Sequence, residues 1–168
     1  FRAVNNHLQI HELGRQVIEV LGFESGITHM EWFLTESGEA VFGEIGGRAP
    51  GGRLTHLMNY ANDIDIFKGW AESVTHGSFS QTIDRRYNAA VIFKRAEGQG
   101  VISRMDGLQG LMARYGDNVA HIDLVPIGSP RRDYRKVVTG DGWIVVRHPD
   151  LEQTVTMAND FSTQLRIY

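Results

Sequence analysis

The chain has 168 residues, 42% hydrophobic and 22% charged, a composition typical of one globular domain or one large piece of a bigger protein. Its formal net charge is −3, so the chain lacks the excess of basic residues that nucleic-acid-binding proteins carry. The absence of cysteine excludes disulfides, thiolate metal sites and cysteine nucleophiles. No apolar run approaches the roughly 20 residues of a membrane span, so we expect a cytoplasmic protein without membrane contact.

Hydrophobic periodicity and turn residues predict the secondary structure in chain order. In the first half we expect a helix, a β-hairpin and two further helices, at residues 10–21, 27–45, 53–62 and 64–74. In the second half we expect the order β-β-α-β-β-α-β, at residues 88–95, 101–105, 107–115, 119–125, 142–147, 150–161 and 165–168. The pattern predicts an α+β fold in two parts, residues 1–85 and a small α+β module at 86–168.

The expected hairpin sets two glutamates opposite each other. With Ser37-Gly38 as the centre of the turn, paired residue numbers sum to 75, so Glu31 faces Glu44. One face of the hairpin then carries His29, Glu31, Phe33 and Thr35 against Ala40, Phe42, Glu44 and Gly46. The other face is apolar and is assigned to the core, with Met30, Trp32 and Leu34 against Val41, Gly43 and Ile45.

Facing carboxylates destabilise a hairpin unless they share a proton, bind a cation or turn apart into solvent. Oxygen ligands without His or Cys partners favour Mg²⁺ or Mn²⁺ over Zn²⁺. Arg48 is expected on the same face, and the loop GGRAPGG offers exposed backbone N–H groups, which together suit a phosphate-bearing substrate. From these residues alone, a metal site and a solvated hairpin face both remain open.

The motif E-x12-E-I-G-G-R-x-P-G-G, preceded by G-I-T-H, resembles the C-terminal part of the ATP-grasp fold. It is most similar to the carboxylate–amine ligases of the L-amino-acid ligase type and less similar to biotin carboxylase. The resemblance implies that Glu31 and Glu44 hold the Mg²⁺ (or Mn²⁺) of bound ATP and that Arg48 is the catalytic arginine beside the transferred phosphoryl group. It also implies substrate contacts by His29, Arg48, Gly51 and Gly52.

One position departs from the pattern of that family. Gly46 stands where many members have a metal-binding Asn, which implies that the two glutamates bind the metal without help from this position. The lid and the ATP-contacting lysines of such enzymes are expected upstream of Phe1, so the fragment alone is expected to be inactive.

The function implied by the resemblance is that of the C-terminal part of an ATP-dependent carboxylate–amine ligase that works through an acyl phosphate. Its partners would be ATP and small-molecule carboxylate and amine substrates. We expect no nucleic-acid partner, and assembly as a homodimer is left open. Two alternatives remain. One is a biotin-carboxylase-like or purine-pathway ATP-grasp carboxylase, and the other is a non-catalytic α+β module for binding or oligomerisation.

Overall fold

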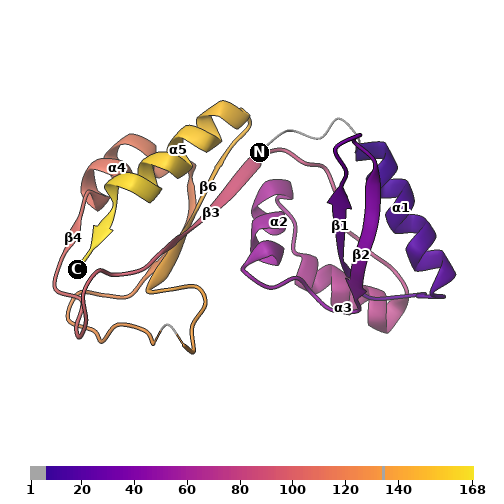
Figure 1. The fold of residues 1–168 in the computed structure, drawn as a ribbon, viewed down its shortest axis with the longest axis horizontal. Helices are drawn as coiled ribbons and strands as arrows, with labels where there is room; N and C mark the ends of the chain where they lie inside the picture. Colours follow the sequence, from indigo (N-terminus) through magenta and orange to yellow (C-terminus); the bar gives the residue numbers. More distant parts are fainter. Residues whose placement is uncertain (1–6, 134) are drawn as a thin grey trace. The chain divides into compact units, whose positions relative to one another are not determined.

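The computed structural model of the protein describes residues 7–133 and 135–168 (Figure 1). Contacts within the chain divide it into two compact units. Unit 1 consists of Phe1–Pro50 and Phe67–Ser80, and unit 2 consists of Gly51–Ile66 and Gln81–Tyr168. The expected division between residues 85 and 86 stays a prediction. Within the described ranges, no helix is long and apolar enough to cross a membrane.

Unit 1 is built around a β-hairpin. Its elements are α1 (His7–Val20), β1 (His29–Leu34), β2 (Ala40–Gly46) and most of α3 (Ile66–His76). Figure 1 shows α1 lying along the hairpin beside β2. The Cε atom of Met30 lies 3.4 Å from the position that a Cβ on Gly14 of α1 would occupy, so α1 covers the face of the hairpin that carries Met30.

Unit 2 is an antiparallel sheet with helices. Its elements are α2 (Leu54–Asn62), β3 (Asn88–Lys94), β4 (Met105–Asp106), α4 (Leu108–Tyr115), η1 (Gly116–Asn118), β5 (Val119–Leu124), β6 (Gly142–His148), α5 (Leu151–Gln164) and β7 (Arg166–Ile167). The main sheet has the strand order β3-β6-β5, and β4 pairs with β7 separately. The expected α+β class and the order of elements in the second half are confirmed.

The central strand β6 is buried on both faces, which is why its sequence reads as a continuous apolar run. On one face, Ile144 and Val146 belong to a core that also contains Ile92, Leu111, Met157, Phe161 and Leu165. On the other face α2 covers the sheet, and His56 of α2 meets Trp143 edge-on at 5.7 Å between ring centroids. All the fully buried apolar side chains among the described residues lie in unit 2.

The prediction of a strand at residues 101–105 is mostly wrong. Only Met105 and Asp106 form a strand, and Val101 makes an isolated bridge to Pro130. Ile102 is fully buried, and its backbone bonds to the loop at residues 128–129 rather than to a sheet. Burial therefore accounts for the apolar character that had indicated a strand.

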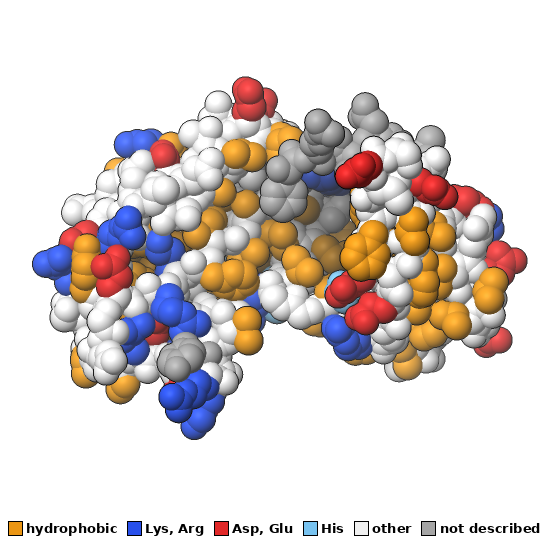
Figure 2. Space-filling model, viewed as in Figure 1, with side chains coloured by type: hydrophobic (Ala, Val, Ile, Leu, Met, Phe, Trp, Pro, Cys, Tyr) orange, Lys and Arg blue, Asp and Glu red, His pale blue; other side chains and the backbone are white. Residues whose placement is uncertain are grey.

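The long loop between β5 and β6 is anchored from inside by a buried carboxylate. Asp141 is 0% exposed and accepts hydrogen bonds from the backbone N–H groups of Ala96, at 2.9 Å, and Arg132, at 2.7 Å. Figure 2 shows Lys and Arg side chains gathered at this loop. The anchor fixes the path of a loop whose other side chains are largely exposed.

Candidate metal and phosphate site on the hairpin

The turn of the hairpin has three residues, whereas a turn centred on Ser37-Gly38 would have an even number. Thr35 and Glu39 flank a three-residue turn, with the Thr35 N–H donating to the Glu39 carbonyl at 2.9 Å and Gly38 at a φ of 85°. Three-residue hairpin loops place a glycine in this left-handed conformation. Near the turn, paired residue numbers therefore sum to 74, so the register predicted there, with a sum of 75, is wrong.

A β-bulge restores the predicted register further along. The ladder shifts between Glu31 and Trp32, opposite Gly43. A Cβ on Gly43 would lie only 3.0 Å from the carbonyl oxygen of Glu31, so a glycine fits this close approach of the two strands. Beyond the bulge Glu31 pairs with Glu44, as predicted. Two deviations from the regular hairpin, one at the turn and one at the bulge, cancel at the acidic pair.

Because of the bulge, the prediction of which residues share a face of the hairpin is partly wrong. Phe42 pairs with Trp32, and Val41 pairs with Phe33, so Phe42 does not share the face of the glutamates. Leu34 was assigned to the core but is 43% exposed, and Phe33 is 68% exposed. The end of the hairpin near the turn is therefore apolar on both faces and largely open.

The two glutamates have no partner within the described part of the chain. Both side chains are exposed, and neither forms an ion pair or hydrogen bond with any residue that the structure describes. Cβ atoms of directly paired strand residues lie about 4.5–5.5 Å apart, near enough for the two carboxylates to repel each other.

Arg48 lies on the same face as the acidic pair. Its Cγ and Nε atoms are 3.5 and 3.6 Å from the position that a Cβ on Gly46 would occupy, and Gly46 and Glu44 share a face as alternate residues of β2. His29 pairs with Gly46 and shares this face too. The structure thus brings together four of the predicted site residues: His29, Glu31, Glu44 and Arg48.

The donor set fits a magnesium ion shared with phosphate. In the ranges that the structure describes, no group of three or more His, Cys, Asp or Glu side chains could hold a metal ion, so a closed protein cage is not formed there. Mg²⁺ usually takes one or two carboxylates and completes its shell with water and substrate phosphate. Two facing glutamates next to an arginine satisfy that pattern, and their role as ligands stays a prediction.

The remaining predicted substrate residues, Gly51 and Gly52, belong to unit 2. They form the turn that precedes α2, where the Leu54 N–H donates to the Gly51 carbonyl at 3.1 Å. Their contact with substrate stays a prediction.

Unit 2 contains a cluster of polar side chains that the sequence analysis did not identify. Arg53 Cζ lies 4.7 Å from the ring centroid of Trp143, and His121 stacks on the same indole at 4.3 Å. Burial lowers the pKa of His56, and the positive charges of Arg53 and His121 lower it further. The spacing of Arg53 and His56 indicates one helix face, but only the fold joins it to His121 and Trp143.

Comparisons with known proteins agree with this structure at the level of the fold. No protein-family model matches the sequence, and no curated protein matches it significantly. A solved structure of L-amino acid ligase from Bacillus licheniformis matches 96% of this chain and 42% of its own, with a TM-score of 0.74 and 20% identity.

Two further structures match nearly the whole chain. N5-carboxyaminoimidazole ribonucleotide synthetase from Thermotoga maritima matches 99% of this chain and 44% of its own (TM-score 0.72, 20% identity). Phosphoribosylglycinamide synthetase from Anaerococcus prevotii gives the same coverages with a TM-score of 0.69 and 16% identity. The chain therefore has the fold of a part of the ATP-grasp enzymes and spans less than half the length of these three.

Proposed function

We propose that this chain is part of an ATP-dependent carboxylate–amine ligase and supplies its metal-binding hairpin. The observation that supports this most strongly is the directly paired Glu31 and Glu44 beside Arg48, on a fold shared with an L-amino acid ligase. A hairpin that sets like charges opposite each other without a described partner is destabilised, unless a cation lies between them.

The chemistry proposed for the complete enzyme has two steps. A substrate carboxylate oxygen attacks the γ-phosphorus of ATP, ADP leaves, and an acyl phosphate forms. The amine nitrogen then attacks the acyl carbon, inorganic phosphate leaves, and after loss of a proton an amide remains. Bound Mg²⁺ would neutralise charge on the phosphate oxygens.

The residues of this chain would bind and position the reactants. Glu31 and Glu44 would hold the metal, and the planar guanidinium of Arg48 suits two-point hydrogen bonding to the phosphoryl group during transfer. The side chain of Arg48 makes one described hydrogen bond, to its neighbour's carbonyl (Ala49, 3.2 Å), so most of its N–H donors remain for a ligand. His29, Gly51 and Gly52 are proposed substrate contacts.

A second candidate within the same fold is a purine-pathway or biotin-carboxylase-like ATP-grasp carboxylase. The match to N5-carboxyaminoimidazole ribonucleotide synthetase, at a TM-score of 0.72, supports it almost as well. Incubation of the full-length protein with ATP and either bicarbonate or amino acids separates the two, because only one class of acceptor should stimulate phosphate release.

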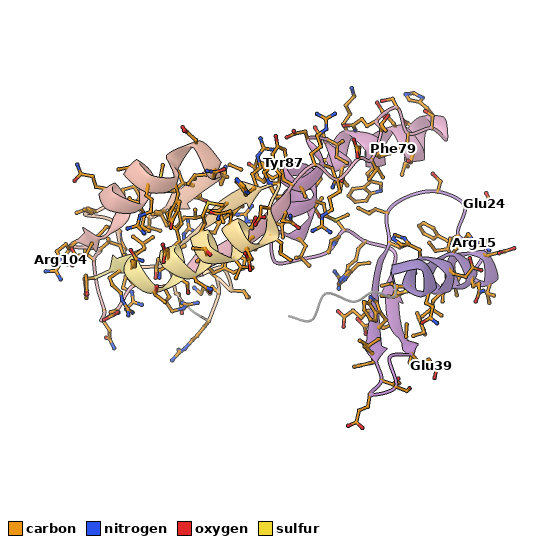
Figure 3. The ribbon with its side chains drawn as sticks, turned by 90° about the horizontal axis from the view of Figure 1, so that it is seen from above. Arg15, Glu24, Glu39, Phe79, Tyr87 and Arg104 are labelled. Carbon is orange, nitrogen blue, oxygen red and sulfur yellow. The ribbon has the colours of Figure 1, made fainter. Side chains whose placement is uncertain are left out.

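Replacing one ligand tests the metal site. We expect Glu44→Gln in the full-length protein to abolish ATP turnover, since the change removes a ligand charge with almost no change in shape. Phosphate release in the presence of ATP and Mg²⁺ is the measurement. Glu39→Gln is the matched control, because Glu39 lies at the turn of the same hairpin (Figure 3). Near-normal phosphate release by Glu44→Gln would contradict the proposal.

Metal binding separates an enzyme from a non-catalytic module. Mn²⁺ titrated with ATP into the full-length protein should bind with a dependence on both Glu31 and Glu44. Binding that is unaffected by Glu31→Gln and Glu44→Gln, or no binding at all, would favour a binding or oligomerisation module.

A further inference from the structure

A pocket of about 340 Å³ lies in unit 1 at the C-terminal ends of α1 and α3. Its lining comes from Ile18 in the last turn of α1 and from the segments 23–28 and 73–79. The Ser25 hydroxyl donates to the Ser73 carbonyl at 2.6 Å and so ties these two segments together. The pocket shares no residue with the ligase site proposed above.

Two phenylalanine rings of the pocket lie tightly against glycines. A Cβ on Gly69 of α3 would overlap the ring of Phe79, so the absence of a side chain there lets the ring lie on the helix. A Cβ on Gly26 would lie 3.1 Å from Cζ of Phe23, and a Cβ on Gly47 would lie 3.6 Å from its Cε2. Phe23 and Phe79 are nevertheless 37% and 40% exposed. Both rings therefore offer a positioned apolar surface that a ligand could still cover.

The charges around the pocket favour a cation. Glu24 lines it, and its carboxylate forms no ion pair or hydrogen bond with any residue that the structure describes. The last turns of α1 and α3 contribute to the lining, and the C-terminal end of a helix carries partial negative charge. The described lining residues include no Lys, Arg or His.

Two hydroxyl groups of the lining are available to a ligand. The side chains of Thr28 and Ser78 form no hydrogen bond with the residues that the structure describes. A hydroxyl oxygen accepts hydrogen bonds, so both side chains suit the N–H groups of an amine. Aromatic rings also attract a cation that lies over their faces.

We propose that this pocket binds a small organic cation, a protonated amine carried by an apolar or aromatic body. Phe23 and Phe79 would contact the body, and Glu24 would pair with the ammonium group (Figure 3 labels Glu24 and Phe79). The proposal does not rest on the ligase function, because it needs neither ATP nor the acidic pair of the hairpin.

The test titrates the full-length protein with phenethylammonium chloride, at constant ionic strength and without ATP or metal, and follows NMR signals. A second arm uses phenethyl alcohol, which has the same ring and no charge. We expect saturable shifts of the Gly26 and Gly77 amides and of the Trp70 indole, whose nitrogen lies 3.9 Å from the Cβ position of Gly26. The ammonium should bind at least about threefold more tightly than the alcohol, as for one partly exposed ion pair.

Matched variants locate the charge and the ring. Glu24→Gln, at an exposed position, should weaken phenethylammonium binding by at least about threefold and leave the binding of the alcohol unchanged. Glu19→Gln is the control, because Glu19 lies in the last turn of α1 but pairs with Arg15 at 3.8 Å and does not line the pocket. Phe79→Leu should weaken the binding of both probes.

Three results would overturn the proposal. The first is unsaturable shifts, and the second is equal binding of phenethylammonium by the Glu24 and Glu19 variants. The third is a set of shifts confined to His29, Glu31 and Glu44, which would place the amine at the hairpin. None of these results bears on the ATP turnover that tests the ligase proposal.

Discussion

At the scale of single residues, the packing of His56 against Trp143 has a consequence for the pH dependence of stability. Burial, followed by the charges of Arg53 and His121, lowers the pKa of His56 in the folded protein. Histidine in an unfolded chain has a pKa of about 6.5. As the pH falls through that value, the unfolded state takes up the proton first, so the free energy of unfolding decreases.

We therefore expect the protein to be less stable at pH 5 than at pH 8, with part of this loss caused by His56. Urea unfolding of the wild type and of His56→Gln across that pH range is the measurement, and the variant should lose less stability on acidification. His11→Gln, at an exposed position of α1, is the control. The same loss in all three proteins would show that His56 has no part in it.

At the scale of elements, the hairpin shows what the sequence can predict. Its two strands, its acidic pair and the position of the return strand follow from alternation and turn residues. The three-residue turn and the bulge at Gly43 do not, because loops of two, three or four residues fit the segment Glu36-Ser37-Gly38-Glu39 about equally well. A bulge leaves only a glycine as its mark, and this sequence has 19 glycines.

Helix boundaries with a specific capping residue were easier to predict. Asp150 was expected to begin the last helix, and its carboxylate accepts the N–H of Gln153 at 2.9 Å. The cluster of Arg53, His56 and His121 could not be predicted, since it joins a helix to a strand about 60 residues later in the chain. Such contacts depend on which face of a sheet a helix covers, and local patterns do not specify this.

Two glycines of the α4 segment should respond in opposite ways to alanine. Gly107 has a φ of 84°, and a Cβ there would clash with the carbonyl oxygen of Gln164, so Gly107→Ala should destabilise the protein by about 2–4 kcal/mol. Gly110 lies inside α4 with nothing near its absent Cβ, so Gly110→Ala should stabilise it by about 0.5–1 kcal/mol. Urea denaturation measures both, and equal effects would contradict the close approach at Gly107.

At the scale of the whole molecule, the buried core is distributed unevenly. The fully buried apolar residues of the described chain lie in unit 2, whereas Phe33, Val41 and Phe42 of unit 1 are all at least 40% exposed. The share of surface buried on folding sets the hydrophobic contribution to stability. Unit 1 should therefore open at a lower free energy than unit 2.

Hydrogen exchange tests this difference. Amides of β1 and β2 in the 168-residue chain should exchange more than about tenfold faster than those of β6, a difference of at least about 1.4 kcal/mol in opening free energy. The comparison is internal, because both sets of amides are in antiparallel strands. Equal protection of the hairpin and β6 would show that unit 1 is stabilised by something other than buried apolar surface.

The bulge at Gly43 also bears on how the spacing between the two glutamates can change in evolution. Pairs near the turn sum to 74 and pairs beyond the bulge sum to 75. Deleting Gly43, the bulged residue, would give every pair of the two strands the same sum of residue numbers. Glu31 and the second glutamate would still face each other. A relative with eleven intervening residues could thus keep the pair that this chain forms with twelve, and a search that demands the longer gap would pass over it.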